Sequence, residues 1–253
     1  MKKNLINSYV MKYSNISAVF PAYNEEKNLE KLVTSADDAL KKYFIIYEII
    51  IVDDGSQDDS KNVLKNLQKK FSCLKIIKNE RNLGYGSALK KGLCAAQNEL
   101  IFFSDADNQF DICEIKKFIE EINNYDVVIG YRLKRNDSFV RKLYAQLFKG
   151  VVYFFFGLKY KDINCAFKIF RKEIIQKTNL YSYMSDGATI NTEMLIRLKK
   201  ISASVKEIPV EHFSRKYGKQ TGGNFLVIFK ALRDLIKLSI NIHSLNDSIE
   251  KNK

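Results

Sequence analysis

Two aspartates separated by a single alanine, Asp105 and Asp107, follow a short apolar run. On a turn that leaves a strand, carboxylates at positions i and i+2 can converge on one cation, and a small residue between them leaves room for a bulky ligand. Mg²⁺ or Mn²⁺ suits this arrangement, because these ions prefer oxygen ligands and are often held by one or two carboxylates plus substrate phosphates. Gln109 is a candidate for a further oxygen ligand. We therefore predict a divalent-cation site at Asp105, Asp107 and Gln109.

Polar residues also follow three earlier apolar runs, at the points where each run ends. They are Pro21, Tyr23 and Glu25 after the first run, Asp53 and Asp54 after the second, and a segment ending at Gly84 just past the third. In open parallel sheets, ligands bind at the carboxyl ends of the strands. One of Asp53 and Asp54 is suited to accept hydrogen bonds from a nucleobase or a ribose. Gly84 allows a close approach to the backbone. Together these strand ends predict a site for a nucleotide.

Basic side chains gather in two later segments and indicate an anionic acceptor. They are Arg132, Lys134, Arg135 and Arg141 in the first segment, and Arg215, Lys216 and Lys219 in the second. Arginine suits a phosphate because its planar guanidinium binds two oxygens at once. A phosphate monoester, with a second pKa near ~6, is already largely dianionic at neutral pH and needs no general base to act as a nucleophile. These segments therefore favour a phosphate acceptor.

The alternative acceptor is a hydroxyl group, which needs a general base to remove its proton. Asp162, Asp186 and Glu193 are the candidate bases. The residues alone leave both kinds of acceptor open.

The elements that must position these residues alternate short β-branched runs with longer helical patterns. Strands are predicted at 16–20, 48–52, 74–77, 100–103 and 126–129, with helices at 26–42, 58–71, 85–97 and 111–123. Such alternation is typical of βαβ units that build a parallel sheet. We therefore predict an α/β fold with a central, mostly parallel sheet flanked by helices.

The second half of the chain mixes longer helices with two further strands. Helices are predicted at 138–156, 192–200 and 225–242, strands at 164–170 and 204–210, and a polar loop at 211–223. No linker or repeat interrupts the pattern, so we predict one domain at 15–223, an extension at 1–14, and a C-terminal helix with a tail at 224–253. The helix at 225–242 places Lys230, Arg233 and Lys237 between apolar residues, which is typical of a helix on an anionic membrane surface or of one packed on its own domain.

Composition excludes several classes of protein. The chain has 253 residues and a net charge of +13, from 42 Lys and Arg against 29 Asp and Glu. This excess attracts anionic partners or reflects a lysine-rich surface. No nucleic-acid-binding motif is present, so we expect no nucleic acid partner. The four cysteines form no C-x-x-C pair, which indicates neither a zinc site nor a disulfide framework. Leu89 stands where a dinucleotide fingerprint has its third glycine, which excludes an NAD site.

The motifs PAYNEE, DDGS, RNLGYGSALKKG, DADNQ, GYR, DINCAFKIFR and HFSRKYGKQTGG follow one another along the chain. This series resembles the inverting glycosyltransferases of family 2, and most of all the branch of dolichyl-phosphate mannose synthase and related polyprenyl-phosphate sugar transferases. The resemblance covers residues 16–223. It implies a GT-A fold, which is Rossmann-like.

The resemblance also implies roles for individual residues. Pro21, Tyr23 and Glu25 would hold the donor nucleotide together with Asp53 or Asp54. Asp105 would face the ribose and the metal, while Asp107 and Gln109 would bind the metal on the donor diphosphate. The acceptor phosphate would be bound by Arg132, Arg141 and Arg215, and Glu193 matches a glutamate of the family. The chain departs from the family at Ala145, where a small hydroxyl residue is common.

The resemblance implies a metal-dependent hexosyltransferase that uses a donor such as GDP-mannose or a UDP-hexose. The acceptor that it implies is a polyprenyl or dolichyl phosphate. The longest apolar run, 151–158, is too short to cross a membrane. We therefore expect a cytoplasmic protein on the inner face of the membrane. Whether it also binds a partner membrane protein stays open. Two alternatives remain: a GT-A transferase acting on a sugar hydroxyl in polysaccharide or glycolipid synthesis, and a non-catalytic nucleotide-binding protein of the membrane surface.

Overall fold

The computed structural model describes residues 13–133, 139–218 and 225–240, and for 139–144 and 225–232 it describes the backbone alone. Several predictions therefore lie outside the described residues. They concern the extension up to residue 12, Lys134, Arg135, Lys219, the side chains of Arg141 and Lys230, and the tail from residue 241.

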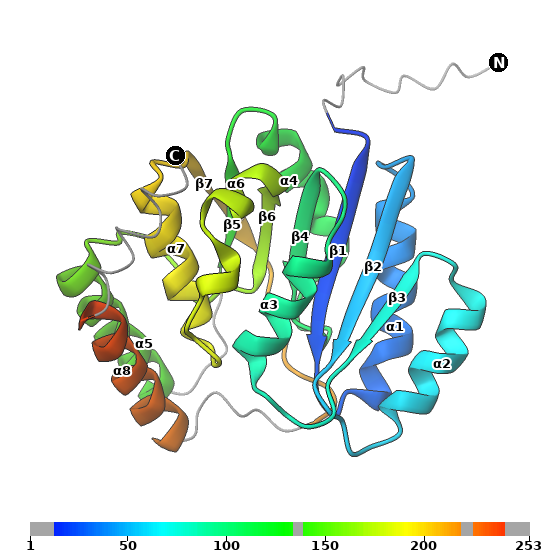
Figure 1. The fold of residues 1–253 in the computed structure, drawn as a ribbon, viewed down its shortest axis with the longest axis horizontal. Coiled ribbons are helices and arrows are strands. Elements are labelled where there is room, and N and C mark those ends of the chain that lie inside the picture. The colour runs from blue at the N-terminus through cyan, green and yellow to red at the C-terminus, as the bar shows by residue number, and fades with distance from the viewer. Residues whose placement is uncertain (1–12, 134–138, 219–224, 241–253) are drawn as a thin grey trace.

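The described strands form one seven-stranded sheet in the order β3-β2-β1-β4-β6-β5-β7. Their bounds are β1 (Asn15–Ala22), β2 (Ile46–Asp53), β3 (Leu74–Lys78), β4 (Leu100–Ser104), β5 (Val127–Arg132), β6 (Phe167–Arg171) and β7 (Val205–Val210). Strands β1 to β4 pair in parallel, and so do β5 and β7. Strand β6 runs antiparallel between β4 and β5. The predicted α/β fold with a mostly parallel sheet is confirmed (Figure 1).

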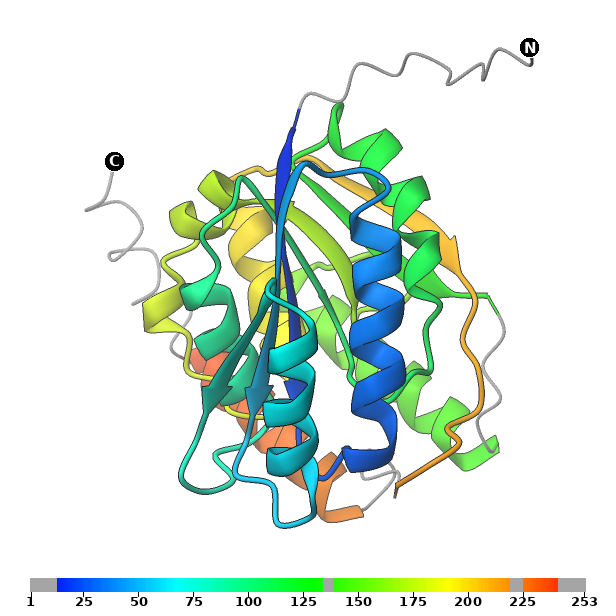
Figure 2. The ribbon, with the colours of Figure 1, turned by 90° about the vertical axis from the view of Figure 1, so that its right-hand side faces the viewer.

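Helices cover both faces of this sheet. Their bounds are α1 (Glu26–Leu40), α2 (Ser60–Lys70), α3 (Tyr85–Ala95), α4 (Ile115–Ile122), α5 (Phe139–Phe156), α6 (Lys172–Lys177), α7 (Ile190–Lys200) and α8 (Phe225–Ile240), with 3₁₀ turns η1 (Ile112–Glu114) and η2 (Leu180–Ser182). Figure 2 shows α1 and α4 on one face and α3 and α7 on the other. The sequence does not predict α6 and η2, which are too short to show a helical period.

Burial explains why these segments form these elements. Strand β4 is buried along its whole length, as its apolar residues Leu-Ile-Phe-Phe require when helices cover both faces. Helix α1 buries Leu29, Leu32, Val33 and Ala36, which recur at the spacing of one helical face. Among the described residues, no helix is long and apolar enough to cross a membrane.

Candidate active site

The carboxyl ends of β1, β2 and β4 meet at one edge of the sheet, at the bottom of Figure 1, because these strands run in parallel. Pro21 is buried in β1, and Tyr23, just after it, is 38% exposed. Ala22 and Asp53 are partners in the ladder between β1 and β2. The structure thus brings the first two polar strand ends together, with the Asp105–Asp107 turn one strand away after β4.

Asp54 uses both carboxylate oxygens to hold the loop that follows β3. Oδ1 accepts hydrogen bonds from the Asn79 side chain at 2.7 Å and the Leu83 backbone at 2.9 Å, and Oδ2 accepts one from the Gly84 backbone at 2.9 Å. Asp53 Oδ1 accepts a hydrogen bond from the backbone of its own turn at 2.9 Å. Both aspartates are buried. Asp54 therefore shapes the site, which makes Asp53 the better candidate for contact with the donor.

The glycines at the start of α3 allow close packing against the chain's own backbone. Gly84 has a φ of +99°, and a β-carbon there would lie 2.6 Å from the Asp186 carbonyl oxygen. A β-carbon on Gly86 would lie 2.4 Å from the Ser185 carbonyl oxygen. The Gly86 amide donates to the Asp186 carbonyl at 2.7 Å. The observed close approach is therefore to the loop before α7, and contact between Gly84 and a nucleotide stays a prediction.

Asp105 and Asp107 lie on the turn that leaves β4, the first half-buried and the second buried. Burial, followed by the negative charge of Asp107, raises the pKa of Asp105 to about 7. Burial also raises the pKa of Asp107. Two neighbouring carboxylates that are shielded from water destabilise each other's charge, and a bound cation relieves that penalty. These carboxylates therefore fit a divalent metal ion.

The remaining metal ligands would have to come from other groups. Within the described ranges, no cluster of three or more His, Cys, Asp or Glu side chains is placed to hold a metal ion. Mg²⁺ and Mn²⁺ accept amide oxygens, water and substrate phosphates alongside one or two carboxylates. The buried side chain of Gln109 lies two residues past Asp107, and its Nε2 donates to the Phe213 carbonyl at 2.8 Å.

The Arg215 guanidinium lies between Glu25 and Asp107. Its Nη2 donates to Glu25 Oε1, its Nη1 is 3.4 Å from Asp107 Oδ2, and its Nε donates to the Tyr217 carbonyl at 2.6 Å. Burial raises the pKa of Glu25, and the hydrogen bond from Asn28 and the charge of Arg215 oppose that rise. Among its described contacts, Arg215 thus binds Glu25 and Asp107, two carboxylates that the sequence predicts at the donor, whereas the sequence predicts Arg215 itself at the acceptor phosphate.

The segment that carries Arg215 is attached to the Asp107 turn by reciprocal contacts. The Phe213 amide donates to the Gln109 carbonyl at 2.8 Å, and the Gln109 side chain donates back to the Phe213 carbonyl at the same distance. The His212 ring packs edge-on against Phe110, with 5.0 Å between ring centroids. Spacing along the chain cannot reveal this contact, because it joins residues about a hundred positions apart.

A second cluster forms at the end of β5, where Arg132 is bound by Asp162. Arg132 Nε donates to Asp162 Oδ2 at 2.6 Å, and Nη2 donates to Oδ1 at 2.9 Å. Such a fork of two parallel bonds fixes the plane of the guanidinium. Asp162 is therefore engaged with Arg132, which does not favour it as a general base. The side chain of Arg141 on α5 lies outside the described residues, and Lys216 is exposed.

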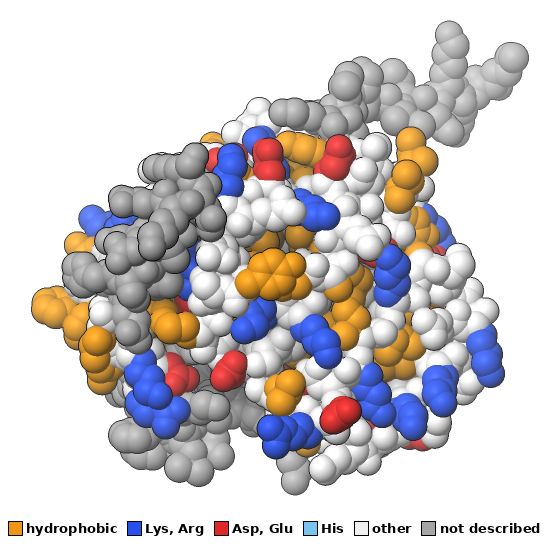
Figure 3. Space-filling model, in the orientation of Figure 1, with side chains coloured by type: hydrophobic (Ala, Val, Ile, Leu, Met, Phe, Trp, Pro, Cys, Tyr) orange, Lys and Arg blue, Asp and Glu red, His pale blue; other side chains and the backbone are white. Residues whose placement is uncertain are grey.

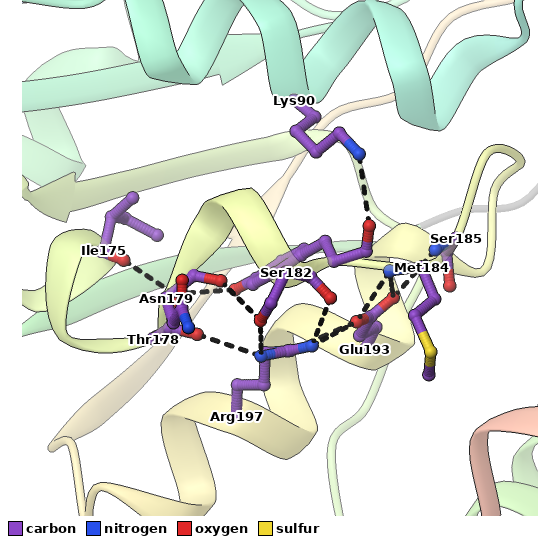
Figure 4. Close-up of polar contacts among 10 residues, drawn as sticks. Lys90, Ile175, Thr178, Asn179, Ser182, Met184, Ser185, Glu193 and Arg197 are labelled. Carbon is purple, nitrogen blue, oxygen red and sulfur yellow. Dashed lines mark hydrogen bonds and ion pairs between the residues drawn. The ribbon is translucent and has the colours of Figure 1, made fainter. Parts of the chain in front are cut away.

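Glu193 is fully buried in α7, with hydrogen-bond donors around its carboxylate (Figure 4). Its oxygens accept bonds from the backbone amides of Met184 and Ser185 at 3.0–3.1 Å, and from the Arg197 side chain at 2.8 and 3.1 Å. Both oxygens are thus engaged within the protein. This geometry favours a structural role for Glu193, and its catalytic role stays a prediction that no contact supports.

Arg197 completes this network by bonding the loop that precedes α7. It donates to the Thr178 carbonyl at 3.2 Å and to the Ser182 carbonyl and hydroxyl at 2.9 and 2.8 Å. From α3, Lys90 donates to the Tyr183 carbonyl at 3.1 Å (Figure 4). The loop that supports Gly84 and Gly86 is therefore held from both sides. Asp186, the third candidate base, is exposed and accepts a hydrogen bond from the Ser87 hydroxyl at 2.8 Å.

Sequence reasoning does not single out Lys168, although it is a fully buried lysine in β6. The sequence feature that could have revealed it is a lysine inside the apolar run C-A-F-K-I-F. The residues directly before and after it in β6 are buried. Lysine is almost never fully buried unless its charge is paired or hydrogen-bonded.

Comparison with known proteins identifies the family of the chain. Residues 17–184 match the model of "Glycosyl transferase family 2". The chain is 29% identical over 227 residues to the dodecaprenyl-phosphate galacturonate synthase of Rhizobium johnstonii, an alignment that covers 88% of this chain and 66% of that protein. It is 30% identical over 223 residues to the undecaprenyl-phosphate 4-deoxy-4-formamido-L-arabinose transferase of Edwardsiella ictaluri, covering 87% and 66%. The chain therefore spans just under two thirds of the length of these relatives.

A solved structure shares the fold. Glucosyl-3-phosphoglycerate synthase from Mycobacterium tuberculosis, in complex with Mn²⁺, UDP and glucosyl-3-phosphoglycerate, superposes with a TM-score of 0.60 at 16% identity, covering 93% of this chain and 80% of that one. At this identity the likeness shows the fold alone. The sheet and its edge, together with the family match over residues 17–184, show that the chain belongs to glycosyl transferase family 2 and has the GT-A fold.

Proposed function

We propose that this chain is an inverting, metal-dependent glycosyltransferase that moves a hexose from a nucleoside diphosphate sugar to a polyprenyl phosphate. The observation that carries the proposal is the pair of carboxylates at the carboxyl end of β4, of which Asp105 is half-buried and Asp107 is buried. The names of two relatives, which describe transfer of sugars to dodecaprenyl and undecaprenyl phosphate, support it.

On the donor side, Asp105 and Asp107 would hold Mg²⁺ or Mn²⁺, with Gln109 as a further ligand. When bound, the metal would stabilise negative charge on the departing diphosphate. Arg215 adds a fixed positive charge beside Asp107. We therefore propose that it lies between the two substrates and binds the donor diphosphate as well as the acceptor phosphate. Asp53 would accept hydrogen bonds from the nucleoside, with Pro21, Tyr23 and Glu25 lining the same edge.

On the acceptor side, Arg132 would bind the phosphate, with Arg141 as its partner from α5. Asp162 fixes the Arg132 guanidinium in one plane, so that its orientation is set before the acceptor arrives. The phosphate is the nucleophile, and it attacks the anomeric carbon as the bond to the nucleoside diphosphate breaks. Its second proton is already lost at neutral pH, so this reaction asks no side chain to act as a base.

The state of the candidate bases favours a phosphate over a hydroxyl acceptor. Asp162 is in a two-point ion pair with Arg132, and both oxygens of Glu193 are engaged in a buried network. Asp186 is exposed and bonded to Ser87. A hydroxyl acceptor would need one of these carboxylates to be released.

The donor is best sought first among UDP sugars, because the solved neighbour binds UDP with Mn²⁺. GDP-mannose is the second candidate.

We also propose that the protein docks on an anionic membrane surface through α5 and α8, on the cytoplasmic face. These two helices contact each other and lie side by side at the lower left of Figure 1. On α5, Phe154 is 82% exposed and Phe155 is 50% exposed. On α8, Ile236 and Ile240 are exposed, next to Lys237. Exposed apolar side chains with nearby cations are typical of helices that lie in an anionic membrane interface.

Figure 3 shows hydrophobic side chains at the left margin and also over the centre and right of the visible face, with Lys and Arg side chains among them. The positive charge on that face does not form one compact patch. We therefore assign the docking surface from the exposed side chains of Phe154, Phe155, Ile236 and Ile240.

The experiment that tests the acceptor compares polyprenyl phosphate, free polyprenol and a sugar acceptor in transfer assays with radiolabelled UDP sugars and GDP-mannose. We expect the label to appear in polyprenyl phosphate alone. We expect Arg132→Lys to lower the rate of sugar transfer to polyprenyl phosphate about 10- to 100-fold, because lysine cannot bind two phosphate oxygens in one plane. Transfer to the sugar hydroxyl, with polyprenyl phosphate inert, would establish the alternative acceptor. Metal-independent nucleotide binding without any turnover would establish the non-catalytic alternative.

A further inference from the structure

The geometry points to Lys168 as a positioning residue that sets the orientation of Arg132 toward the acceptor phosphate. This inference rests on the proposed function, since it assigns to Lys168 a part in binding the acceptor that Arg132 is proposed to bind.

Lys168 is completely buried in the middle of the sheet. Strand β6, which carries it, lies between β4 and β5, and Lys168 is paired with Phe103 on one side and Ile129 on the other. An ammonium group taken out of water in this way is costly unless its protons are hydrogen-bonded. A leucine or methionine would fit a core strand at this position. The presence of a lysine therefore indicates that its ammonium group has a function.

The hydrogen bonds of the ammonium group indicate this function. Its Nζ donates to the Cys165 carbonyl, to the Ile163 carbonyl at 3.4 Å and to Asn191 Oδ1 at 2.8 Å. An ammonium group has three protons to donate, and these contacts match that number. Two of the three acceptors are backbone carbonyls of the short segment that leads into β6. Lys168 thus holds that segment, and Asn191 connects it to α7.

This same segment carries the carboxylate that binds Arg132. Asp162 directly precedes Ile163, and its carbonyl accepts a hydrogen bond from the Cys165 amide at 3.4 Å. The Asp162 carboxylate then receives two bonds from the Arg132 guanidinium. A continuous series of contacts therefore runs from the Lys168 ammonium group, through the backbone at 163–165, to Asp162 and Arg132.

Removal of the ammonium group would loosen this series. Lys168→Met would leave two buried carbonyls and the Asn191 oxygen without their donor, and the segment would shift to find other donors. Asp162 would move with the segment, and the plane of the Arg132 guanidinium would no longer be set. We therefore expect a selective loss of acceptor binding.

Arg171 offers a matched control on the same strand. Like Lys168, it donates to two backbone carbonyls, those of Ile122 and Asn123 at 3.1 Å, and it also pairs with Asp126. It lies at the other end of β6, opposite Leu100 at the start of β4. Arg171→Met removes a similar set of contacts far from Arg132, so it reports the effect of lost stability alone.

The test measures the Kd for farnesyl phosphate in detergent micelles and the Kd for UDP with Mn²⁺, both by calorimetry, on the full chain. The variants are Lys168→Met, Asp162→Asn, their double variant, Arg132→Ala and Arg171→Met. We expect Lys168→Met to weaken farnesyl phosphate binding about tenfold, which is the loss of roughly one oriented hydrogen bond. We expect no weakening of UDP–Mn²⁺ binding, because the charge of Lys168 acts on Asp105 and would repel a bound cation. Arg171→Met should lower the thermal midpoint and leave both Kd values unchanged.

Two further results decide how the effect arises. The double variant should bind farnesyl phosphate about as weakly as the weaker single variant, because both changes act on one series of contacts. Equal weakening of both ligands by Lys168→Met, or no weakening beyond that of Arg171→Met, would overturn the inference. Should Lys168→Met fail to fold, Lys168→Gln, which keeps an amide donor, carries the same test with a smaller expected effect.

The Arg132→Ala variant separates this inference from the proposed function. If Arg132→Ala leaves farnesyl phosphate binding intact, the proposed acceptor site is wrong, and the inference is wrong with it. If Arg132→Ala abolishes binding while Lys168→Met does not change it, the acceptor site stands and Lys168 has no part in it.

Discussion

Glu193 and Arg197 form an ion pair with both side chains fully buried, and Glu193 also accepts two backbone amides. Loss of one partner of such a pair leaves a buried charge without its counter-charge, which costs about 3–5 kcal/mol. The pair therefore stabilises the fold, whether or not Glu193 takes part in catalysis. A general base, by contrast, contributes about 100- to 10,000-fold to the rate.

Glu193→Gln distinguishes these two roles. We expect the free energy of unfolding, measured with urea, to fall by about 3 kcal/mol because Arg197 keeps its buried charge. We expect kcat for the folded enzyme to fall by less than about tenfold, with no change in the shape of its pH profile. A loss of kcat above about 100-fold, with stability unchanged, would instead identify Glu193 as a base.

Lys168 provides a pH-dependent test of burial. Burial lowers its pKa from 10.5 to about 8, and the nearby carboxylates of Asp162 and Asp105 oppose that shift. The folded pKa is thus below the unfolded one, so burial of the charged lysine costs its full penalty below pH 8. The penalty is relieved as pH rises from about 8 towards 10.5, because over this range the unfolded state binds more protons than the folded state.

We therefore expect the stability of the wild-type protein to rise relative to Lys168→Met between pH 7 and pH 9.5, by about 2 kcal/mol. Urea unfolding of both proteins at the two pH values measures this difference. Identical pH dependence in the two proteins would show that Lys168 is not titrated in this range.

At the scale of the elements, the packing of α3 on the loop before α7 depends on Gly86. Its missing β-carbon would lie within 2.4–2.8 Å of backbone atoms of Ser185, Asp186 and Gly187, and backbone cannot move aside as a flexible side chain can. Gly150 on α5 is the matched control, because a β-carbon there meets nothing within 4 Å.

Gly86→Ala should lower the free energy of unfolding by about 1–3 kcal/mol through overpacking. It should also weaken UDP–Mn²⁺ binding, since α3 follows directly from the loop that Asp54 holds. Gly150→Ala should raise stability by about 0.5–1 kcal/mol, as expected for an open helical position. Thermal unfolding of the two variants measures both effects, and an equal shift in both would contradict this account of α3.

The elements of the first half can be predicted from the sequence because each is long enough to show its own period. Strand β1 and helix α1, for example, begin and end within two residues of the predicted bounds. The antiparallel direction of β6 cannot be predicted in this way, because no local pattern distinguishes it from a parallel strand in a buried sheet. Helix α6 is a single short turn after β6 and shows no period.

The site is predictable in part for the same reason. Strand ends such as Asp53 and Asp105 are positioned by the parallel topology, which the alternation of elements indicates. The pairing of Arg215 with Glu25 joins residues 190 positions apart, and that of Arg132 with Asp162 joins residues 30 positions apart. Such contacts depend on how loops fold over the edge of the sheet, so spacing could not show that Arg215 contacts Glu25 and Asp107 or that Lys168 is buried.

We propose a membrane-facing surface on α5 and α8. Phe154→Ser should weaken cosedimentation with vesicles that contain phosphatidylglycerol, roughly tenfold, because a buried Phe side chain contributes about 1.5–3 kcal/mol. Ile45→Ser is the control, since Ile45 is 88% exposed and precedes β2, whereas Phe154 is on α5. Equal effects of the two changes would rule out α5 as the docking surface.

Calorimetric titration of UDP into the wild-type protein and Asp107→Asn, with and without Mn²⁺, tests whether the β4 carboxylates hold the metal that binds the donor. We expect Mn²⁺ to strengthen UDP binding by the wild-type protein, and we expect Asp107→Asn to lose most of this gain while its binding without metal is unchanged. Binding of UDP to the wild-type protein that is the same with and without Mn²⁺, or a gain that Asp107→Asn retains in full, would contradict this expectation.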